Sequence, residues 1–330
     1  MASPELVLRR ADELVHAGRA IEAVDELSAH LRVQRDPEVE RRLVAVRHQA
    51  FGQLPTGDGH PTWPRRLADP FPGESGIPTT TSEHLDADVL GGALLHHGCL
   101  RVDGLLAADE VARMVELIDA AFDERERAAA HTGGATYVPF ELGRERAAGF
   151  GHDGFVRVVD VPAAAFELVE LFTSSGVRRT VTDHLGERPA MIANKWVLRR
   201  SPSGKIGADF HQDGAFLGTG IRTVDCWIAL SDCGPGTDRP AIEVVPRRFP
   251  LLEAGDAAAF SWSLHPDTVR SAMPDAEVAT PTFGAGDALF FDELLPHRTS
   301  MGTDLRERYA IESWFVAPSS YPDRHVPVVL

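Results

Sequence analysis

Apolar residues recur at helical spacing along the first fifty residues of the chain. They follow one another at intervals of three and four, which places them on one face of a helix. These residues are Leu6, Ala11, Leu14, Ala17, Ile21, Val24 and Leu27. Pro4 suits the first turn of a helix, and Asp36-Pro37-Glu38 marks a second helix start. The pattern predicts a small helical appendage over residues 1–51.

Within this appendage, the stretch AGRAIEAVDEL is similar to half of a tetratricopeptide unit. A single unit is too short to build a solenoid. We therefore expect tetratricopeptide-like helices that could offer a contact to a protein partner.

The pattern changes over residues 52–82, which are dense in Gly, Pro, Thr and Ser and predict a linker or a wrapping loop. Beyond them, Ser82 is a candidate cap for a helix that carries Leu85, Val89 and Leu94. A strand over CLRVDGLL and an amphipathic helix over AADEVARMVELIDAAFDERERAAA follow. This helix has acids early and arginines late, as the helix dipole favours.

From about residue 150 onward, short apolar runs alternate with turns rich in Gly, Pro and Asp. The runs are FVRVVDV, AMIANKWVLRR, VDCWIALSD, AIEVVP, DALFFDELL and YAIESWFVAP. Strands of this length and spacing are typical of an antiparallel sandwich or barrel. The chain is therefore expected to be mainly β with helical cladding, and residues 83–330 are expected to form its principal domain.

Composition excludes several classes of partner. The formal net charge of −16 disfavours binding to nucleic acid or to an anionic membrane surface. No apolar run is long enough to span a bilayer, and the first residues lack the apolar core of a signal peptide. The three cysteines are few and scattered, which indicates reduced thiols in the cytoplasm. A small-molecule substrate remains the default expectation.

The strongest chemical feature is His211-Gln212-Asp213, which His297 follows 86 residues later. In an extended strand, residues two apart project from the same face, so His211 and Asp213 can converge on one ion. A second imidazole from a distant strand would complete a set of two histidines and one carboxylate. Such a set leaves coordination positions open and suits non-haem Fe(II) oxygenases.

The His-x-Asp pattern by itself carries little information, because this chain contains it three times. His84 and Asp86 lie where a helix is expected to start. His265 and Asp267 flank a proline, which is unfavourable in an inner strand. Both of these pairs are expected to have surface or capping roles. The adjacent His96 and His97 are likewise expected to be structural, because neighbouring side chains diverge.

The feature that distinguishes the middle copy is Arg308, which lies 11 residues beyond His297. The stretch HRTSMGTDLRERYAIESWF predicts a strand, a turn around Gly302 and a returning strand that carries Arg308 beside the metal. A buried guanidinium there can grip the far carboxylate of a dicarboxylate in a bidentate fork. Arg306 is the rival, and its polar surroundings predict that it faces solvent.

With this triad and arginine, the chain resembles the phytanoyl-CoA dioxygenase (PhyH) family of Fe(II)/2-oxoglutarate-dependent oxygenases. The matching segments span roughly residues 90–318. They are CLRVDGLLAADEVARMVELIDAAF, FHQDGAF, CWIALSD, AIEVVPRRF, GAGDALFFDELLPHRTS and ERYAIESWF. The family's glycine-serine-histidine turn is replaced by Arg247-Arg248-Phe249, and residues 1–60 have no counterpart.

The resemblance implies a double-stranded β-helix (jelly-roll, cupin-like) core. It also implies iron held by His211, Asp213 and His297, and 2-oxoglutarate that chelates the iron and forms a salt bridge with Arg308. Thr299 matches a hydroxyl position that assists the same carboxylate. The cosubstrates are then 2-oxoglutarate and O2, and ascorbate could serve as reductant.

The strand before the ligand strand often borders the cosubstrate in this fold. Asn194 or Trp196 is therefore expected to contact 2-oxoglutarate or substrate, the alternative being sheet packing for Trp196 and solvent for Lys195. Trp227 and Phe291 are expected in the core. A group of arginines near the pocket could meet an anionic substrate or could be surface charges: Arg199, Arg200, Arg247 and Arg248.

The function predicted on these grounds is hydroxylation of an unactivated C–H bond of a small metabolite, as by a tailoring enzyme of secondary metabolism. Two other functions remain as alternatives. One is a cupin-like isomerase or hydrolase that uses a different metal and no 2-oxoglutarate. The other is a non-catalytic interaction protein that binds a partner through its N-terminal helices.

Overall fold

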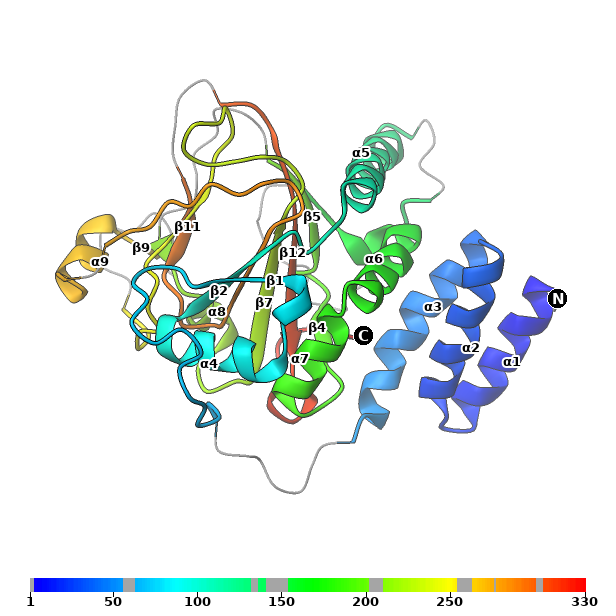
Figure 1. Cartoon of the computed structure of the whole chain (residues 1–330). Coiled ribbons are helices and arrows are strands. Elements are labelled where there is room, and N and C mark those ends of the chain that lie inside the picture. Colours follow the sequence, from blue (N-terminus) through cyan, green and yellow to red (C-terminus); the bar gives the residue numbers. More distant parts are fainter. Residues whose placement is uncertain are drawn as a thin grey trace.

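The structure, a computed structural model, describes residues 3–55, 63–131, 136–140, 154–201, 210–253, 263–275, 277–300 and 305–330. Within these residues, three helices are followed by two facing sheets with further helices on the outside (Figure 1). None of the helices found there has both the length and the apolar character that crossing a bilayer requires.

The N-terminal residues are helical, as the apolar spacing predicts, and they form three helices where the sequence indicated two helix starts. They are α1 (Pro4–His16), α2 (Ala20–Val33) and α3 (Pro37–Ala50), followed by the 3-10 turn η1 (Phe51–Gln53). Pro4 opens α1, and the Asp36 carboxylate caps α3 by accepting the backbone N–H groups of Glu38 and Val39. The continuous stripe predicted from Leu6 to Leu27 breaks at Gly18, whose φ of +73° lets the chain reverse.

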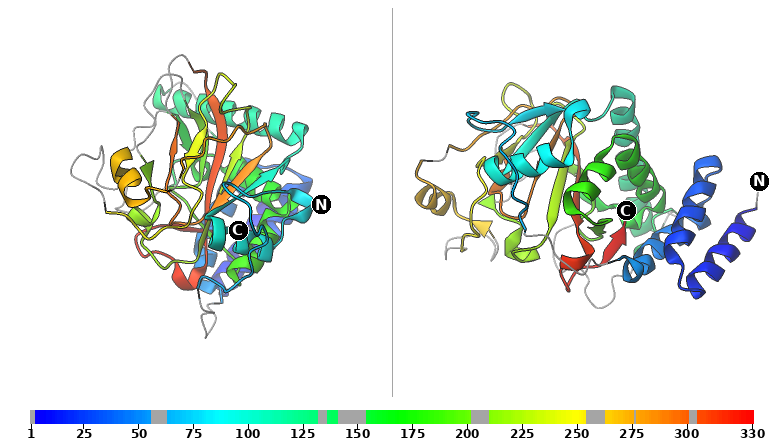
Figure 2. Two further views of the ribbon diagram at one scale, coloured as in Figure 1. Left: turned by 60° about the vertical axis from the view of Figure 1, so that its left-hand side comes forward. Right: turned by 60° about the horizontal axis from the view of Figure 1, so that its bottom comes forward.

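This helical unit is joined to the rest of the molecule by buried polar contacts. Arg47 on α3 donates from Nη1 to the carbonyl of Val329 at 2.9 Å, and His48 Nδ1 lies 2.8 Å from the carbonyl of Pro327. Phe166 and Val329 contribute to the same apolar cluster as the three helices. Figure 1 shows α3 lying against α6, and Figure 2 shows the three helices together at one side of the molecule.

The larger sheet forms the framework of the main domain. Its strand order is β1-β2-β10-β7-β12-β4-β13, and β5 also pairs with β12 and carries β3 at its other edge. The strands are β1 (Thr79–Thr81), β2 (Cys99–Asp103), β3 (Phe155–Arg157), β4 (Ala190–Ile192), β5 (Val197–Ser201), β7 (Thr223–Ala229), β10 (Ala288–Phe291), β12 (Arg308–Val316) and β13 (Pro327–Val329). All pairings in it are antiparallel except that of β1 with β2.

A smaller sheet in the order β8-β11-β6-β9 faces the first. Its strands are β6 (Phe210–His211), β8 (Ile242–Val244), β9 (Ser263–Leu264) and β11 (His297–Thr299). Apolar residues from both sheets, among them Trp227, Phe291 and Val244, fill the space between them. Two facing antiparallel sheets with helical cladding are the jelly-roll that the sequence predicts.

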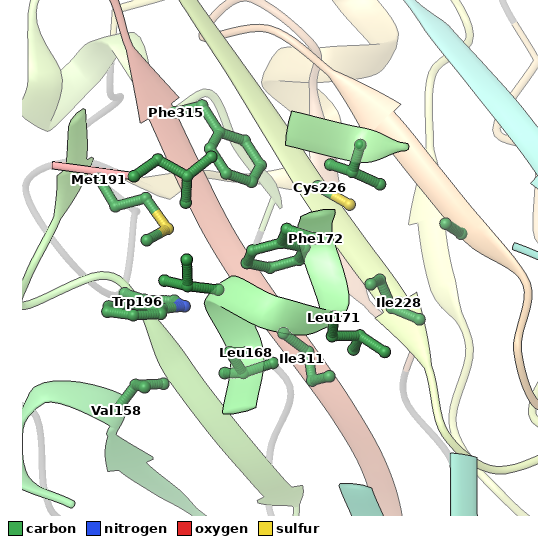
Figure 3. Packing of buried hydrophobic residues seen from close by; sticks show 14 of the residues in the cluster. Val158, Leu168, Leu171, Phe172, Met191, Trp196, Cys226, Ile228, Ile311 and Phe315 are labelled. Carbon is green, nitrogen blue, oxygen red and sulfur yellow. The ribbon is translucent and has the colours of Figure 1, made fainter. Parts of the chain in front are cut away.

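Helices cover the outer face of the larger sheet. They include α4 (Ala87–His97), α5 (Ala108–Ala129), α6 (Pro162–Ser174) and α7 (Val177–Leu185), whereas α8 (Gly214–Leu217) and α9 (Pro266–Ala272) are short. The remaining 3-10 turns are η2 (Ser82–His84), η3 (Val158–Asp160) and η4 (Pro318–Ser320). Figure 3 shows Phe172 and Leu168 of α6 packed beside Phe315 and Ile311 of β12.

Two of the expected elements differ in the structure. Ser82 does not cap the helix that follows it; Asp86 does, by accepting the backbone N–H groups of Asp88 and Val89. The expectation of strands alone beyond residue 150 missed α6 and α7. Buried residues occupy most of α6, so its sequence lacks the polar face that identifies a surface helix.

Candidate metal centre

The first two residues of the predicted triad lie where a strand turns into a helix. His211 ends β6, and Asp213 stands directly before α8 with helical backbone angles. The expectation that both residues project from one extended strand is therefore wrong. They converge nonetheless, because the chain turns after His211 and the amides of Phe216 and Leu217 bond to the carbonyl of Asp213.

His297 opens β11 and pairs with His211 across the smaller sheet. Its Nε2 lies 3.9 Å from Asp213 Oδ1, and His211 Nε2 lies 3.8 Å from the same oxygen. The imidazole rings of the two histidines have centroids 4.2 Å apart. One ligand atom from each residue falls within 4.8 Å of the others, so the three can surround one cation.

Hydrogen bonds orient two of these three side chains. His297 Nδ1 lies 3.0 Å from the carbonyl of Leu295. Because a carbonyl only accepts, Nδ1 carries the proton and Nε2 presents its lone pair to the site. On the other side, the Trp314 indole N–H donates to Asp213 Oδ2 at 2.7 Å.

These contacts leave Asp213 Oδ1 without a hydrogen-bond partner among the described residues, although the side chain is 1% exposed. Burial raises the pKa of Asp213, and the nearby His297 and Lys195 oppose that rise. An orphaned carboxylate oxygen between two imidazole nitrogens is the arrangement that a divalent cation satisfies. The donor set therefore fits iron.

Gln212, between the two ligand residues, has a role that the sequence does not reveal. Its Nε2 donates to the carbonyls of Leu294 at 2.7 Å and Phe249 at 3.0 Å, and its Oε1 accepts the amide of Leu252 at 2.8 Å. Gln212 thus fastens the segment that replaces the family's usual turn to the ligand-bearing chain.

Arg308 reaches the interior at the first residue of β12. The side chain is 2% exposed, and its Nη1 donates to the carbonyls of Pro240 and Ala241, both at 2.9 Å. Its Nη2 lies 3.4 Å from Thr299 Oγ1. Thr299 stands two residues after His297 on β11, on the same face of the strand and roughly 7 Å along it. The structure therefore brings Arg308 and Thr299 together beside the histidine.

One edge of this guanidinium remains available. Arg308 Nε has no hydrogen-bond partner among the described residues, and burial lowers the pKa of Arg308 to about 10. The guanidinium also lies over Trp227, 5.2 Å from the ring centroid. An open Nε–Nη2 edge beside a threonine hydroxyl fits a carboxylate held in a fork. Arg306 is exposed, as expected, and the turn around Gly302 lies outside the described residues.

The other two His-x-Asp copies have the capping roles expected of them. Asp86 caps α4, and His265 stands at the start of α9, where its Nδ1 accepts the amide of Asp267 at 3.3 Å. His96 and His97 also have separate structural partners, the carbonyl of Leu67 and the carboxylate of Asp69 respectively.

Asn194 and Trp196, the two residues expected to contact 2-oxoglutarate or substrate, have different surroundings in the structure. Residues 193–195 make a turn between β4 and β5, and Asn194 Oδ1 lies 3.4 Å from His325 Nδ1. The Trp196 indole points into the core on the helix-covered face of the larger sheet, beside Met191 and Val158 (Figure 3). The alternative of sheet packing is correct for Trp196, because its turn directs it away from the inner face.

Lys195, for which a position in solvent was the alternative, turns towards the metal centre. Its Nζ lies 3.9 Å from the ring centroid of Phe216 and 5.5 Å from that of Trp314. Burial lowers the pKa of Lys195, and Asp213 and Glu312 oppose the decrease.

The four arginines for which an anionic substrate and a surface position were both left open are mostly engaged with acids. Arg199 pairs with Glu312, Arg200 Nη1 lies 3.0 Å from Asp119 Oδ1, and Arg248 Nε lies 2.5 Å from Asp292 Oδ2. Arg247 is exposed.

Comparison with known proteins agrees with this geometry. The model of the phytanoyl-CoA dioxygenase family matches residues 94–306, which include the triad. No curated protein matches the chain.

Several solved structures are similar to this chain at low sequence identity. EctD from S. alaskensis, determined with 2-oxoglutarate and 5-hydroxyectoine, is 17% identical with a TM-score of 0.50, covering 69% of this chain and 75% of its own. The α-ketoglutarate-dependent epimerase SnoN from nogalamycin biosynthesis is 18% identical to this chain, with a TM-score of 0.47. The alignment covers 70% of this chain and 83% of SnoN. The carbocyclase SnoK of the same biosynthesis is 18% identical to this chain, with a TM-score of 0.48. The alignment covers 73% of this chain and 87% of SnoK.

Proposed function

The chain belongs to the phytanoyl-CoA dioxygenase family, and on that premise we propose that it is an Fe(II)- and 2-oxoglutarate-dependent oxygenase. Its proposed reaction is hydroxylation of an unactivated C–H bond in a small-molecule metabolite, as by a tailoring enzyme of secondary metabolism. The observation that carries the proposal is the pairing of the triad with a buried arginine whose Nε is open.

Each residue has a defined task in this proposal. His211, Asp213 and His297 hold the iron, with Trp314 and the carbonyl of Leu295 fixing two of the ligands. Iron held by these residues would supply, together with O2 and 2-oxoglutarate, the oxidising chemistry that C–H hydroxylation requires. Ascorbate would keep the iron reduced.

Arg308 and Thr299 are proposed to bind the far carboxylate of 2-oxoglutarate. The distance along β11 from His297 to Thr299 lets one end of a five-carbon diacid lie at the metal while the other meets the guanidinium. The buried setting strengthens this ion pair and excludes water. Asp213 would supply a carboxylate ligand to the metal where a halogenating enzyme would need a halide, so we propose hydroxylation over halogenation.

The two alternative functions account less well for these residues. A cupin-like isomerase or hydrolase would use the triad but has no need of Arg308. A non-catalytic interaction protein needs neither the triad nor Arg308, both of which are buried polar groups that cost stability when they have no ligand. The three functions differ in whether Fe(II) and 2-oxoglutarate bind together.

The decisive experiment is an anaerobic titration of the protein with Fe(II) and then 2-oxoglutarate. We expect a weak visible charge-transfer band on addition of 2-oxoglutarate, and 2-oxoglutarate consumption once O2 and a substrate are admitted. His211→Ala and Asp213→Ala should lose both.

The matched control is the His-x-Asp motif at the start of α9, His265→Ala and Asp267→Ala, which should retain both signals. Full turnover by His211→Ala or Asp213→Ala would refute the proposed ligand set. Metal binding without the 2-oxoglutarate band would favour the cupin-like alternative.

We also propose a division of the chain into residues 1–51 as a helical unit, 52–82 as a connecting segment and 83–330 as the oxygenase domain, with the end of the connecting segment adding strand β1 to the larger sheet of that domain. The contacts of Arg47 and His48 with β13 support a helical unit that is docked on this domain. A protein contact through the outer helices, α1 and α2, is compatible with this arrangement.

A further inference from the structure

A second set of charged side chains lies on the inner face of the larger sheet, below the triad. On β7, Trp227 and Ala229 belong to the cluster between the two sheets, whereas Val224 and Cys226 belong to the core under the helices. Strand alternation therefore places Asp225 on the inner face. On β12 the same alternation places Glu312 and Trp314 inward.

Asp225 sits between two residues that touch the triad. In the sheet register, Asp225 pairs with Phe291 of β10 on one side and with Trp314 of β12 on the other. The Phe291 ring centroid lies 4.7 Å from that of His297, and Trp314 donates its hydrogen bond to Asp213. A group bound by Asp225 would therefore lie next to the metal centre.

The Asp225 carboxylate has no donor of its own. Its side chain is 1% exposed, and neither oxygen has a hydrogen-bond partner among the described residues. Glu312, its acidic neighbour, is already paired with Arg199. A buried carboxylate without a donor is unfavourable by more than a typical hydrogen bond contributes, so this position calls for a donor that the described residues do not supply.

The components of the proposed reaction leave few sources for that donor. Iron carries no hydrogen, and 2-oxoglutarate is a dianion that only accepts hydrogen bonds. Burial and the neighbouring Glu312 and Asp213 raise the pKa of Asp225, and only two cations, Arg199 and Lys195, oppose this rise. Three acids thus stand against two cations among these residues, so a further positively charged donor is favoured over a neutral one. Water is the remaining source, and the experiment below separates it from the substrate.

We propose that Asp225 is the residue that anchors the substrate, and that the substrate carries a protonated nitrogen near the C–H bond that is attacked. This inference rests on the proposed function, since it assumes that iron and 2-oxoglutarate occupy the triad and Arg308. It favours an amine over the anionic substrate that the arginines left open as one alternative.

The test uses the whole protein with Fe(II) and matched pairs of small molecules. Each pair consists of a primary or secondary amine and the alcohol of the same carbon skeleton. Binding is followed anaerobically as a change in the Fe(II)–2-oxoglutarate band, and turnover as succinate release. We expect amines to perturb the band and to be preferred over their alcohols by at least about tenfold.

The variant Asp225→Asn keeps the shape of the side chain and removes its charge. It should reduce the preference for amine over alcohol by about tenfold or more, and this ratio is independent of the overall rate. Asp119→Asn, a change at an acid that pairs with Arg200 on the outside, should keep the wild-type preference. If Asp225→Asn does not fold, the pairs measured on the wild-type protein decide by themselves.

The failures of the two proposals are distinguishable. Absence of the Fe(II)–2-oxoglutarate band in the wild-type protein would overturn the proposed function. A normal band that amines do not perturb, or that alcohols perturb equally, would overturn the amine proposal alone and would assign water to Asp225. An Asp225→Asn variant that keeps the amine preference would do the same.

Discussion

The hydrogen bond from Trp314 to Asp213 should set how tightly the protein holds its metal. Trp314→Phe keeps an aromatic ring under the site but removes the indole N–H that lies 2.7 Å from Asp213 Oδ2. Asp213 is 1% exposed, so no bulk water replaces the lost donor. The carboxylate would then rotate more freely, and its free oxygen would spend less time facing the two histidines.

The size of this effect follows from the type of bond. A buried hydrogen bond to a charged group contributes about 1.5–3 kcal/mol. Each 1.4 kcal/mol changes an equilibrium constant about tenfold, so the Kd for Fe(II) should rise roughly 10- to 100-fold. The loss should not be complete, because the backbone of α8 still holds Asp213 in place.

The assay is an anaerobic titration of metal-free protein with Fe(II) in the presence of saturating 2-oxoglutarate. Trp63→Phe is the matched control, because the Trp63 indole N–H has no hydrogen-bond partner among the described residues and its ring contacts His184 away from the metal. An unchanged Kd for Trp314→Phe, or an equal rise for both variants, would refute a positioning role for Trp314.

Three further predictions concern other buried polar groups. Arg308→Ala should raise the KM for 2-oxoglutarate by roughly 10- to 100-fold with a smaller change in kcat, because it removes the proposed carboxylate fork; an unchanged KM in steady-state kinetics would contradict that assignment. Burial lowers the pKa of His184 to about 4. Between pH 6.5 and 4, therefore, only the unfolded chain takes up a proton at this histidine. The free energy of unfolding should fall by up to about 3 kcal/mol as the pH drops through that window. Denaturant melts should show a weaker fall for His184→Leu than for His96→Leu, and parallel pH curves for the two variants would argue against it. Arg47→Ala should lower the free energy of unfolding by about 2–4 kcal/mol, since it leaves a cavity and a carbonyl without its donor, whereas the exposed Arg41→Ala on the same helix should change it little.

The chemically decisive residues could be found in the sequence because their chemistry is restrictive. His211, Asp213, His297 and Arg308 combine residue types and spacings that few other functions need. The sequence also excluded the competing His-x-Asp pairs from turn and proline chemistry, and the structure places Asp86 and His265 at helix starts. The prediction that one extended strand carries both His211 and Asp213 was wrong, since Asp213 lies in a turn after the strand.

The supporting residues could not be found, because the strands that carry them are buried on both faces. Every residue of β7 is buried, so its sequence shows no polar side from which an inner face could be read. Whether Asp225 or Cys226 faces the metal depends on which side the helices cover. The position of α6 decides which side the helices cover. Because most residues of α6 are buried, its sequence shows no polar face by which the helix could be predicted.

The same limit explains Lys195 and Trp196. They are neighbours in the chain, and a turn between β4 and β5 directs the lysine towards the metal centre and the indole into the core in Figure 3. The sequence by itself determined the fold class and the residues that we propose to hold iron and a dicarboxylate, because these depend on residue type and spacing. Only the tertiary structure decided which buried charges stand around them, because the direction of a side chain on a doubly buried sheet is set by packing against residues far away in the chain.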